Sequence, residues 1–298
     1  MPRLSPALLA FALLTPLPVL AQTTAYEIQP AKLDPAVHDF TDPSIAIPHA
    51  GAPLAIFLPG TGGKPEGNPR FAQFIADQGY AVISLEYDDD PAVAQVCPQS
   101  PDPDCSEAFR RVRVDGVEAG PGTSPVHNPP AEAITARLSA LLHGLALAKP
   151  KEGWDRYLDG DQPRWDRIVV SGLSQGAGMA AYIAKHHQVA RVVLFSSPWD
   201  VTGRDHHPAP WLSQPSATPM DRWYAEYNQR ELTADLIKNA YAALQIPPDH
   251  IRVFARDLPA SFHGNSPNPY HVITIIDHAY EPDWKIMYGK PMPDGTVQ

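Results

Sequence analysis

The sequence predicts an α/β protein with a mostly parallel, doubly wound sheet and helices on both of its faces. Short apolar strands alternate with segments of helical periodicity through most of the chain. One of these strands turns into a helix at a Gly-x-Ser-x-Gly corner, Gly172 to Gly176. With 298 residues, of which 44% are hydrophobic and 19% charged, the chain fits one large globular domain.

The first half of the chain predicts an edge strand and then two further strands of the sheet with a helix between them. Residues 44–47 are suited to an edge strand, and 54–58 form a continuous apolar run of the kind buried on both faces of a parallel sheet. Asn68 and Pro69 then start a helix that ends at Gly79, and residues 80–85 form the next strand.

The remaining elements continue the alternation of helices and strands. We expect a helix over 130–148, the corner strand at 168–171, its helix at 175–184, and further strands at 192–195, 223–227 and 251–254, with a helix through Leu244. Residues 88–129 and 199–222 contain many prolines or irregular segments, and we expect them to be surface excursions, the second a possible lid.

Ser174 lies at the corner between the strand and the helix. The small neighbours Gly172 and Gly176 permit a sharp, strained turn in which the serine hydroxyl points away from the sheet, near the positive end of the helix that follows. The pattern therefore predicts a nucleophilic serine, against the alternative of a plain strand-to-helix turn.

A glycine-rich loop, residues 59–63, follows the apolar strand 54–58. Its backbone N–H groups can approach a substrate carbonyl without a side chain in the way. We expect the N–H of Thr61 or Gly62, together with that of Gln175, to form an oxyanion hole. A phosphate-binding loop is disfavoured because Lys64 is followed by proline, where the Walker pattern needs Ser or Thr.

A nucleophilic serine needs a carboxylate and an imidazole, which in this architecture follow it in the order acid, then histidine. Glu231 is the preferred acid because it follows the strand 223–227 directly, with Asp200 as the alternative and Asp257 third. By position alone, His278 and His263 are close as the base. His271, which starts the apolar stretch 272–276, is expected to be structural.

These motifs resemble the α/β-hydrolase superfamily, over residues 50–280. More narrowly, the segments 194–200, 222–231 and 271–278 are similar to a group of exported bacterial α/β-hydrolases labelled BPSS-type. The resemblance implies a Ser174–His278–Glu231 triad and favours His278 over His263. This sequence departs from the group where Glu231 replaces the usual aspartate and Ala279 replaces the glycine after the histidine.

Residues 1–21 are typical of a cleaved signal peptide, with Arg3, an apolar core from Ala7 to Leu14, and a small-x-small pattern that ends at Ala21. Residues 22–298 then form the mature single domain. Export to the periplasm or the medium permits a disulfide between the only two cysteines, Cys97 and Cys105.

The net charge of −10 argues against nucleic-acid binding and against an acidic membrane surface, and we expect no stable membrane insertion. The adjacent pairs His186–His187 and His206–His207 are poor metal sites, and 88–90 is a solvated acidic turn. We expect no metal or organic cofactor. The predicted function is ester hydrolysis of a small acyl substrate, with a peptidase or amidase, or an inactive binding protein, as alternatives.

Overall fold

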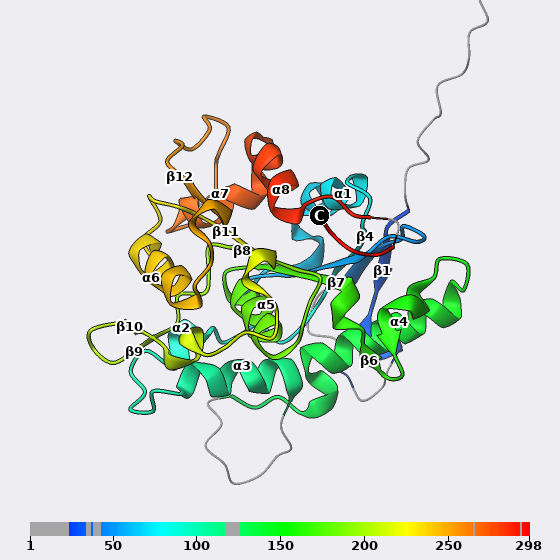
Figure 1. Ribbon diagram of the computed structural model, residues 1–298, viewed down its shortest axis with the longest axis horizontal. Helices are drawn as coiled ribbons and strands as arrows, with labels where there is room; N and C mark the ends of the chain where they lie inside the picture. Colours follow the sequence, from blue (N-terminus) through cyan, green and yellow to red (C-terminus); the bar gives the residue numbers. More distant parts are fainter. Residues whose placement is uncertain (1–23, 34–36, 38–42, 117–125, 265, 293) are drawn as a thin grey trace, which may run out of the picture.

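The computed structural model describes residues 24–33, 37, 43–116, 126–264, 266–292 and 294–298 (Figure 1). Its centre is an eight-stranded sheet. In spatial order the strands are β1 (Tyr26–Ile28), β2 (Ser44–Ile47), β4 (Ala81–Ser84), β3 (Leu54–Leu58), β7 (Ile168–Leu173), β8 (Arg191–Phe195), β11 (Trp223–Asn228) and β12 (Ile251–Phe254).

The six strands from β4 to β12 are parallel, and β1 and β2 add an antiparallel edge. Leu58 of β3 pairs with Gly172 of β7, and Leu173 of β7 pairs with Phe195 of β8. The carboxyl ends of neighbouring parallel strands therefore meet at one edge of the sheet, where ligands bind in open α/β sheets.

Helices cover both faces of the sheet (Figure 1). One apolar cluster joins the sheet to α1 (Pro69–Asp77), α7 (Pro269–Ile276) and α8 (Glu281–Tyr288). The cluster on the other face includes α2 (Val93–Val96), α3 (Cys105–Asp115), α4 (Ile134–Ala148), α5 (Gln175–His186) and α6 (Ala234–Leu244). With this strand order and these two helical layers, the chain has an α/β-hydrolase fold.

The central strands are buried along their whole length, as their continuous apolar sequences predict. Every residue of β3, β7 and β8 is buried. Phe71 of α1 makes edge-on ring contacts with Phe57 and Phe195 of the sheet and with Trp284 of α8, at centroid distances of 5.2, 5.3 and 4.9 Å. Such pairs add about 0.5–1.5 kcal/mol each to the free energy of burial.

The expected excursion 88–129 is not only a loop, because it contains the helices α2 and α3. The eleven residues of α3 bury Phe109 and Val112, but the same face also buries Arg110 and Arg113. Charged residues at core positions hide the helical hydrophobic period, which is why the sequence pattern did not predict this helix.

The disulfide between Cys97 and Cys105 is confirmed, with a Cα–Cα distance of 5.6 Å. It links the residue that follows α2 to the first residue of α3. In the second excursion, β9 (Val201–Thr202) and β10 (His207–Pro208) form a small hairpin, and β5 (Leu158–Asp159) pairs with β6 (Gln162–Pro163) elsewhere.

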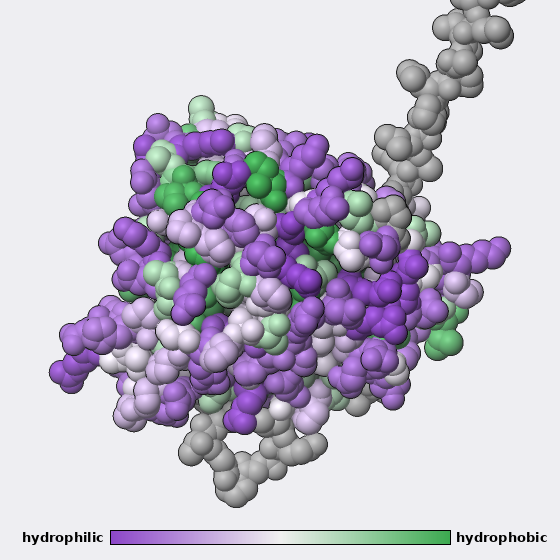
Figure 2. All heavy atoms as spheres, viewed as in Figure 1, coloured by the Kyte–Doolittle hydropathy of each residue, from purple (hydrophilic) through white to green (hydrophobic). Residues whose placement is uncertain are grey.

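The surface seen in Figure 2 is mostly hydrophilic, with separated small apolar patches. Among the helices that the structure describes, each is too short or too polar to cross a bilayer. The signal peptide expected at residues 1–21 lies outside the described residues.

Candidate active site

Ser174 lies at the corner between β7 and α5, as the Gly-x-Ser-x-Gly pattern predicts. Its backbone has φ 54° and ψ −120°, a conformation that a non-glycine residue adopts at a cost of about 1–3 kcal/mol. The Ser174 N–H donates to the Phe195 carbonyl at 2.9 Å, which fixes the corner to the end of β8. The side chain is half-buried and does not cap its own helix.

The two glycines of the pattern allow the strand, the corner and the helix to pack closely. A Cβ on Gly176 would lie 1.9 Å from the carbonyl oxygen of Leu58, and one on Gly172 would lie 2.4 Å from the carbonyl carbon of Gly176. These are backbone atoms, which cannot move away as a flexible side chain can. The glycines therefore bring the nucleophile corner directly against the end of β3.

The loop after β3 reaches Ser174. A Cβ built on Gly60 would lie 3.1 Å from the Ser174 Cβ, so this loop passes beside the serine with little free space. The Gly63 N–H donates to the Gly60 carbonyl at 2.8 Å and closes the turn. Proximity of the loop to Ser174 agrees with its expected place in the oxyanion hole.

The two expected loop donors differ in their partners. The Gly62 N–H donates to Oδ1 of Asp89 at 3.3 Å. The Thr61 N–H has no acceptor among the described residues, and Thr61 is exposed. Of these two residues, Thr61 is therefore the one whose N–H is available to a substrate oxygen in this conformation.

Glu231, the preferred acid, is buried just beyond the carboxyl end of β11. Its Oε1 accepts hydrogen bonds from the Ser196 hydroxyl at 2.6 Å and from the Asn228 N–H at 2.9 Å. Ser196 follows Phe195, the residue whose carbonyl binds the Ser174 N–H. The acid and the serine are thus anchored to consecutive residues at the end of β8.

The other carboxylate oxygen of Glu231 binds an imidazole, and that imidazole belongs to His271. Nδ1 of His271 lies 2.7 Å from Oε2 of Glu231. The Glu231 side chain is fully buried, and the His271 side chain is 16% exposed. A buried carboxylate bonded to Nδ1 leaves Nε2 as the ring nitrogen that can exchange a proton with another group.

His278 and His263, the two expected bases, lie elsewhere. Nε2 of His278 is 2.9 Å from a guanidinium nitrogen of Arg70, its Nδ1 binds Glu281, and half of its side chain (51%) is exposed. His263 is exposed in the loop between β12 and α7. The structure therefore pairs Glu231 with His271 and not with either expected histidine.

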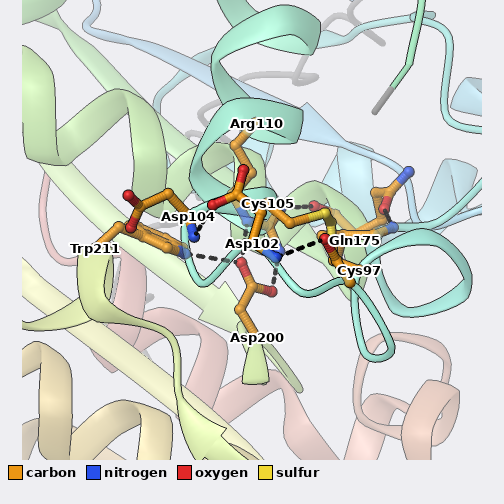
Figure 3. Close-up of a disulfide and its surroundings, with 10 residues drawn as sticks. Cys97, Asp102, Asp104, Cys105, Arg110, Gln175, Asp200 and Trp211 are labelled. Carbon is orange, nitrogen blue, oxygen red and sulfur yellow. Dashed lines mark hydrogen bonds and ion pairs between the residues drawn. A yellow bond between two sulfur atoms is a disulfide. The ribbon is translucent and has the colours of Figure 1, made fainter. Parts of the chain in front are cut away.

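Asp200, the alternative acid, is part of a different buried group (Figure 3). Both of its oxygens accept from the Arg110 guanidinium, at 2.6 and 2.5 Å, and Oδ2 also accepts from the Trp211 indole at 3.0 Å. The third acid, Asp257, forms an exposed ion pair with Arg230. Glu231 is thus the acid among the three that contacts a histidine.

The position of His271 follows from the start of α7, which the sequence reasoning missed. Pro269 is the first residue of this helix and Asn268 precedes it. The same Asn-Pro pair starts α1 at Asn68 and Pro69, as the sequence predicts. Applied at 268–269, this signal would have placed His271 in the first turn of a helix.

A second buried carboxylate, Glu226 on β11, lies close to Glu231. Its Oε1 accepts from the Thr274 hydroxyl at 2.9 Å, and Oε2 has no partner among the described residues. Burial raises the pKa of Glu226 well above its ordinary value, and the negative charge of Glu231 raises it further. Burial and the neighbouring charge therefore both favour the protonated form of Glu226.

In the described part of the chain, no three His, Cys, Asp or Glu side chains are grouped in a way that could hold a metal ion. The acidic turn has other contacts: Asp88 binds Arg113, and Asp89 binds Gly62.

Comparison with solved structures finds similar chains among hydrolases. The Pyrococcus furiosus esterase Pf2001 is 15% identical, with 89% of each chain covered and a TM-score of 0.43. Esterase B from Lactobacillus rhamnosis is 15% identical, with 86% of this chain and 81% of that one covered, and a TM-score of 0.43. A 2,6-dihydroxy-pseudo-oxynicotine hydrolase is 14% identical, with 89% and 68% covered and a TM-score of 0.42.

No family model and no curated protein matches the sequence. The functional assignment therefore depends on the site of this chain itself.

Proposed function

We propose that this protein is an exported serine hydrolase that cleaves a carboxylic ester through an acyl-enzyme intermediate. Ser174 is the nucleophile, His271 the general base and then the general acid, and Glu231 the residue that orients His271. The observation that carries the proposal is the 2.7 Å contact between His271 Nδ1 and the buried Glu231 carboxylate, at the sheet edge where Ser174 lies.

In the first half-reaction the Ser174 hydroxyl attacks the ester carbonyl while Nε2 of His271 accepts its proton. The negative charge that develops on the carbonyl oxygen is stabilised by the N–H groups of Gln175 and Thr61. His271 then donates its proton to the departing alcohol, and the acyl group remains bound to Ser174.

In the second half-reaction a water molecule attacks the acyl-enzyme, and His271 again accepts and returns one proton. Glu231 holds one tautomer of the ring and stabilises the imidazolium in both halves. The hydrogen bonds from Ser196 and Asn228 to Glu231 support this role, because they fix the acid before substrate arrives.

His271 replaces His278 in the proposed triad for a geometric reason. The carboxylate partner of His278 is Glu281, three residues along the same chain segment, and its other nitrogen faces the positive guanidinium of Arg70. A base in that setting has no buried acid of the kind that supports proton transfer from serine.

Export is part of the proposal, as is membership of the BPSS-type group. Supporting observations are the N-terminal pattern of residues 1–21 and the disulfide between Cys97 and Cys105, a bond that forms and persists in oxidising compartments.

Labelling with a fluorophosphonate tests the proposed nucleophile. We expect the wild-type protein to form a covalent adduct and to hydrolyse an aryl acetate, and Ser174→Ala to lose both properties. Ser213→Ala, at an exposed serine, is the matched control and should behave as the wild type. A folded wild-type protein that stays unlabelled, or a Ser174→Ala variant that is still labelled, contradicts the proposal.

A further inference from the structure

We infer that one short segment, residues 88–93, holds the two halves of the oxyanion hole at a fixed separation, with Asp89 and the side chain of Gln175 as its positioning residues. The inference rests on the proposed function and deepens it. The two halves are the backbone of Gln175, after the nucleophile, and the loop 59–63, after β3. They come from different strands, so their spacing depends on what connects them.

Gln175 attaches the segment to the nucleophile corner. Its side-chain oxygen accepts from the Val93 N–H at 2.8 Å, and its side-chain nitrogen donates to the carbonyls of Asp89 and Pro91 at 2.7 and 3.1 Å. The Gln175 side chain is buried, the bond from Val93 is buried, and the two bonds to the carbonyls are partly buried. The residue that supplies one oxyanion donor therefore also binds both ends of the segment.

Asp89 attaches the same segment to the other half. Its side chain accepts from the Gly62 N–H at 3.3 Å. Burial raises the pKa of Asp89 to about 6, and the negative charge of Asp90 acts in the same direction, although the hydrogen bond from the Gly62 N–H lowers it. At neutral pH the group is thus mostly an ionised carboxylate, which accepts hydrogen bonds only.

The bond to Asp89 distinguishes Gly62 from its neighbour Thr61. Gly62 has φ +68° and directs its N–H to Asp89, whereas the Thr61 N–H has no partner among the described residues. A buried hydrogen bond from the Tyr87 hydroxyl to the Pro59 carbonyl, at 2.7 Å, holds the start of the same loop. The loop is therefore held at both ends, with Thr61 between them.

The segment is in turn fixed to α3. Arg113 binds the Asp88 carboxylate and donates to the Asp90 carbonyl at 2.8 Å, and it also donates to Asn128 at 3.0 Å. The Arg113 side chain is 1% exposed. Residues 88–93 are therefore held in place by a packed helix, α3, which makes them a rigid link between the two halves of the oxyanion hole.

Substitution of Asp89, with Asp90 as the matched control, tests the inference. Asp89→Ala removes the acceptor of the Gly62 N–H. Asp89→Asn keeps an acceptor oxygen, and Asp90→Ala changes an exposed neighbouring carboxylate whose backbone carbonyl stays in place. The readouts are kcat and KM for an aryl acetate, and the inhibition constant of an aryl trifluoromethyl ketone, which forms an oxyanion on the serine.

We expect Asp89→Ala to lower kcat by about 10- to 100-fold, with KM changed by less than about threefold, because a displaced donor acts on the transition state. Binding of the trifluoromethyl ketone should weaken by a similar factor. Asp89→Asn should recover most of the loss, and Asp90→Ala should match the wild type. Gln175→Leu should lower kcat in the same way.

Two results overturn the inference: wild-type kcat and ketone affinity in Asp89→Ala, or an equal loss in Asp90→Ala. A change confined to KM also contradicts it, because that would mean a role in substrate binding alone. Failure of the proposed function itself is distinguishable, since the wild-type protein would then neither hydrolyse the ester nor react with a fluorophosphonate.

Discussion

Two buried acids, Glu231 and Asp200, follow neighbouring strands, and their partners assign them different roles. Glu231 accepts hydrogen bonds from neutral donors on Oε1 and leaves Oε2 to an imidazole. Asp200 uses both oxygens on the guanidinium of Arg110. A carboxylate already neutralised by a buried arginine cannot also stabilise an imidazolium well, so Asp200 is a structural acid.

Removing the structural acid should lower stability strongly. In Asp200→Ala the Arg110 side chain, which is 0% exposed, keeps its charge without its partner. Breaking such a buried pair costs about 3–5 kcal/mol, whereas Asp257→Ala, in the exposed pair with Arg230, should change stability little. Urea unfolding measures both, and equal effects of the two substitutions would contradict the structural role of Asp200.

The arrangement of the site depends on the close approach of three backbone segments. The end of β3, the corner at Ser174 and the first turn of α5 meet without any side chain between them. Position 176 requires glycine because a Cβ there would collide with the backbone of Leu58. Its backbone conformation is not the reason, since its φ is not positive.

Gly176→Ala should therefore be one of the most damaging small substitutions in the chain. Its Cβ would lie 1.9 Å from the Leu58 carbonyl oxygen, so the helix or the strand must shift. We expect a loss of more than about 3 kcal/mol in unfolding free energy, or failure to fold. Gly67→Ala, whose Cβ would meet its nearest neighbour at 3.7 Å, is the control and should change stability little. Similar thermal melting of the two variants would contradict this packing.

The strands and the corner at Ser174 could be predicted because their signals are local. Each strand is a short apolar run, and the corner is five consecutive residues. The helix α3 could not be predicted from sequence, because Arg110 and Arg113 occupy its buried face. Their charges are compensated by Asp200 and Asp88, which are distant in sequence. The choice among histidines failed for the same reason, since the contact of His271 with Glu231 spans forty residues.

Two buried carboxylates hold α7, the helix that carries the proposed base, against the sheet. His271 and Thr274 lie three residues apart on α7, hence on one face, and they bind Glu231 and Glu226 respectively. Glu226 and Thr274 are both buried, in the layer between the sheet and the helices α7 and α8. The stability of this layer is therefore linked to the protonation of Glu226.

This linkage predicts a pH dependence of stability with a definite sign. Because the folded-state pKa of Glu226 is raised, its protonated form stabilises the protein fully below the ordinary value of 4.5, and this contribution is lost as the pH rises toward the folded-state pKa. Glu226→Gln mimics the protonated form and cannot ionise. The difference in melting temperature, variant minus wild type, should grow as the pH rises above the ordinary value of 4.5.

Glu27→Gln, at an exposed position of β1, is the control for this measurement and should show no such trend. A difference for Glu226→Gln that stays constant over the range, or that shrinks as the pH rises, would mean that Glu226 is ionised in the folded protein.

The most direct measurement of the central claim compares ester hydrolysis by His271→Ala and His278→Ala, each as a folded protein, with the fluorophosphonate reaction rate as a second readout. Removal of the base that activates Ser174 should lower kcat by at least about 10³-fold and slow the covalent reaction similarly. We predict this loss in His271→Ala and near wild-type rates in His278→Ala, whose histidine is half exposed and bound to Glu281 and Arg70. Near wild-type rates in His271→Ala, with the loss in His278→Ala, would contradict the account.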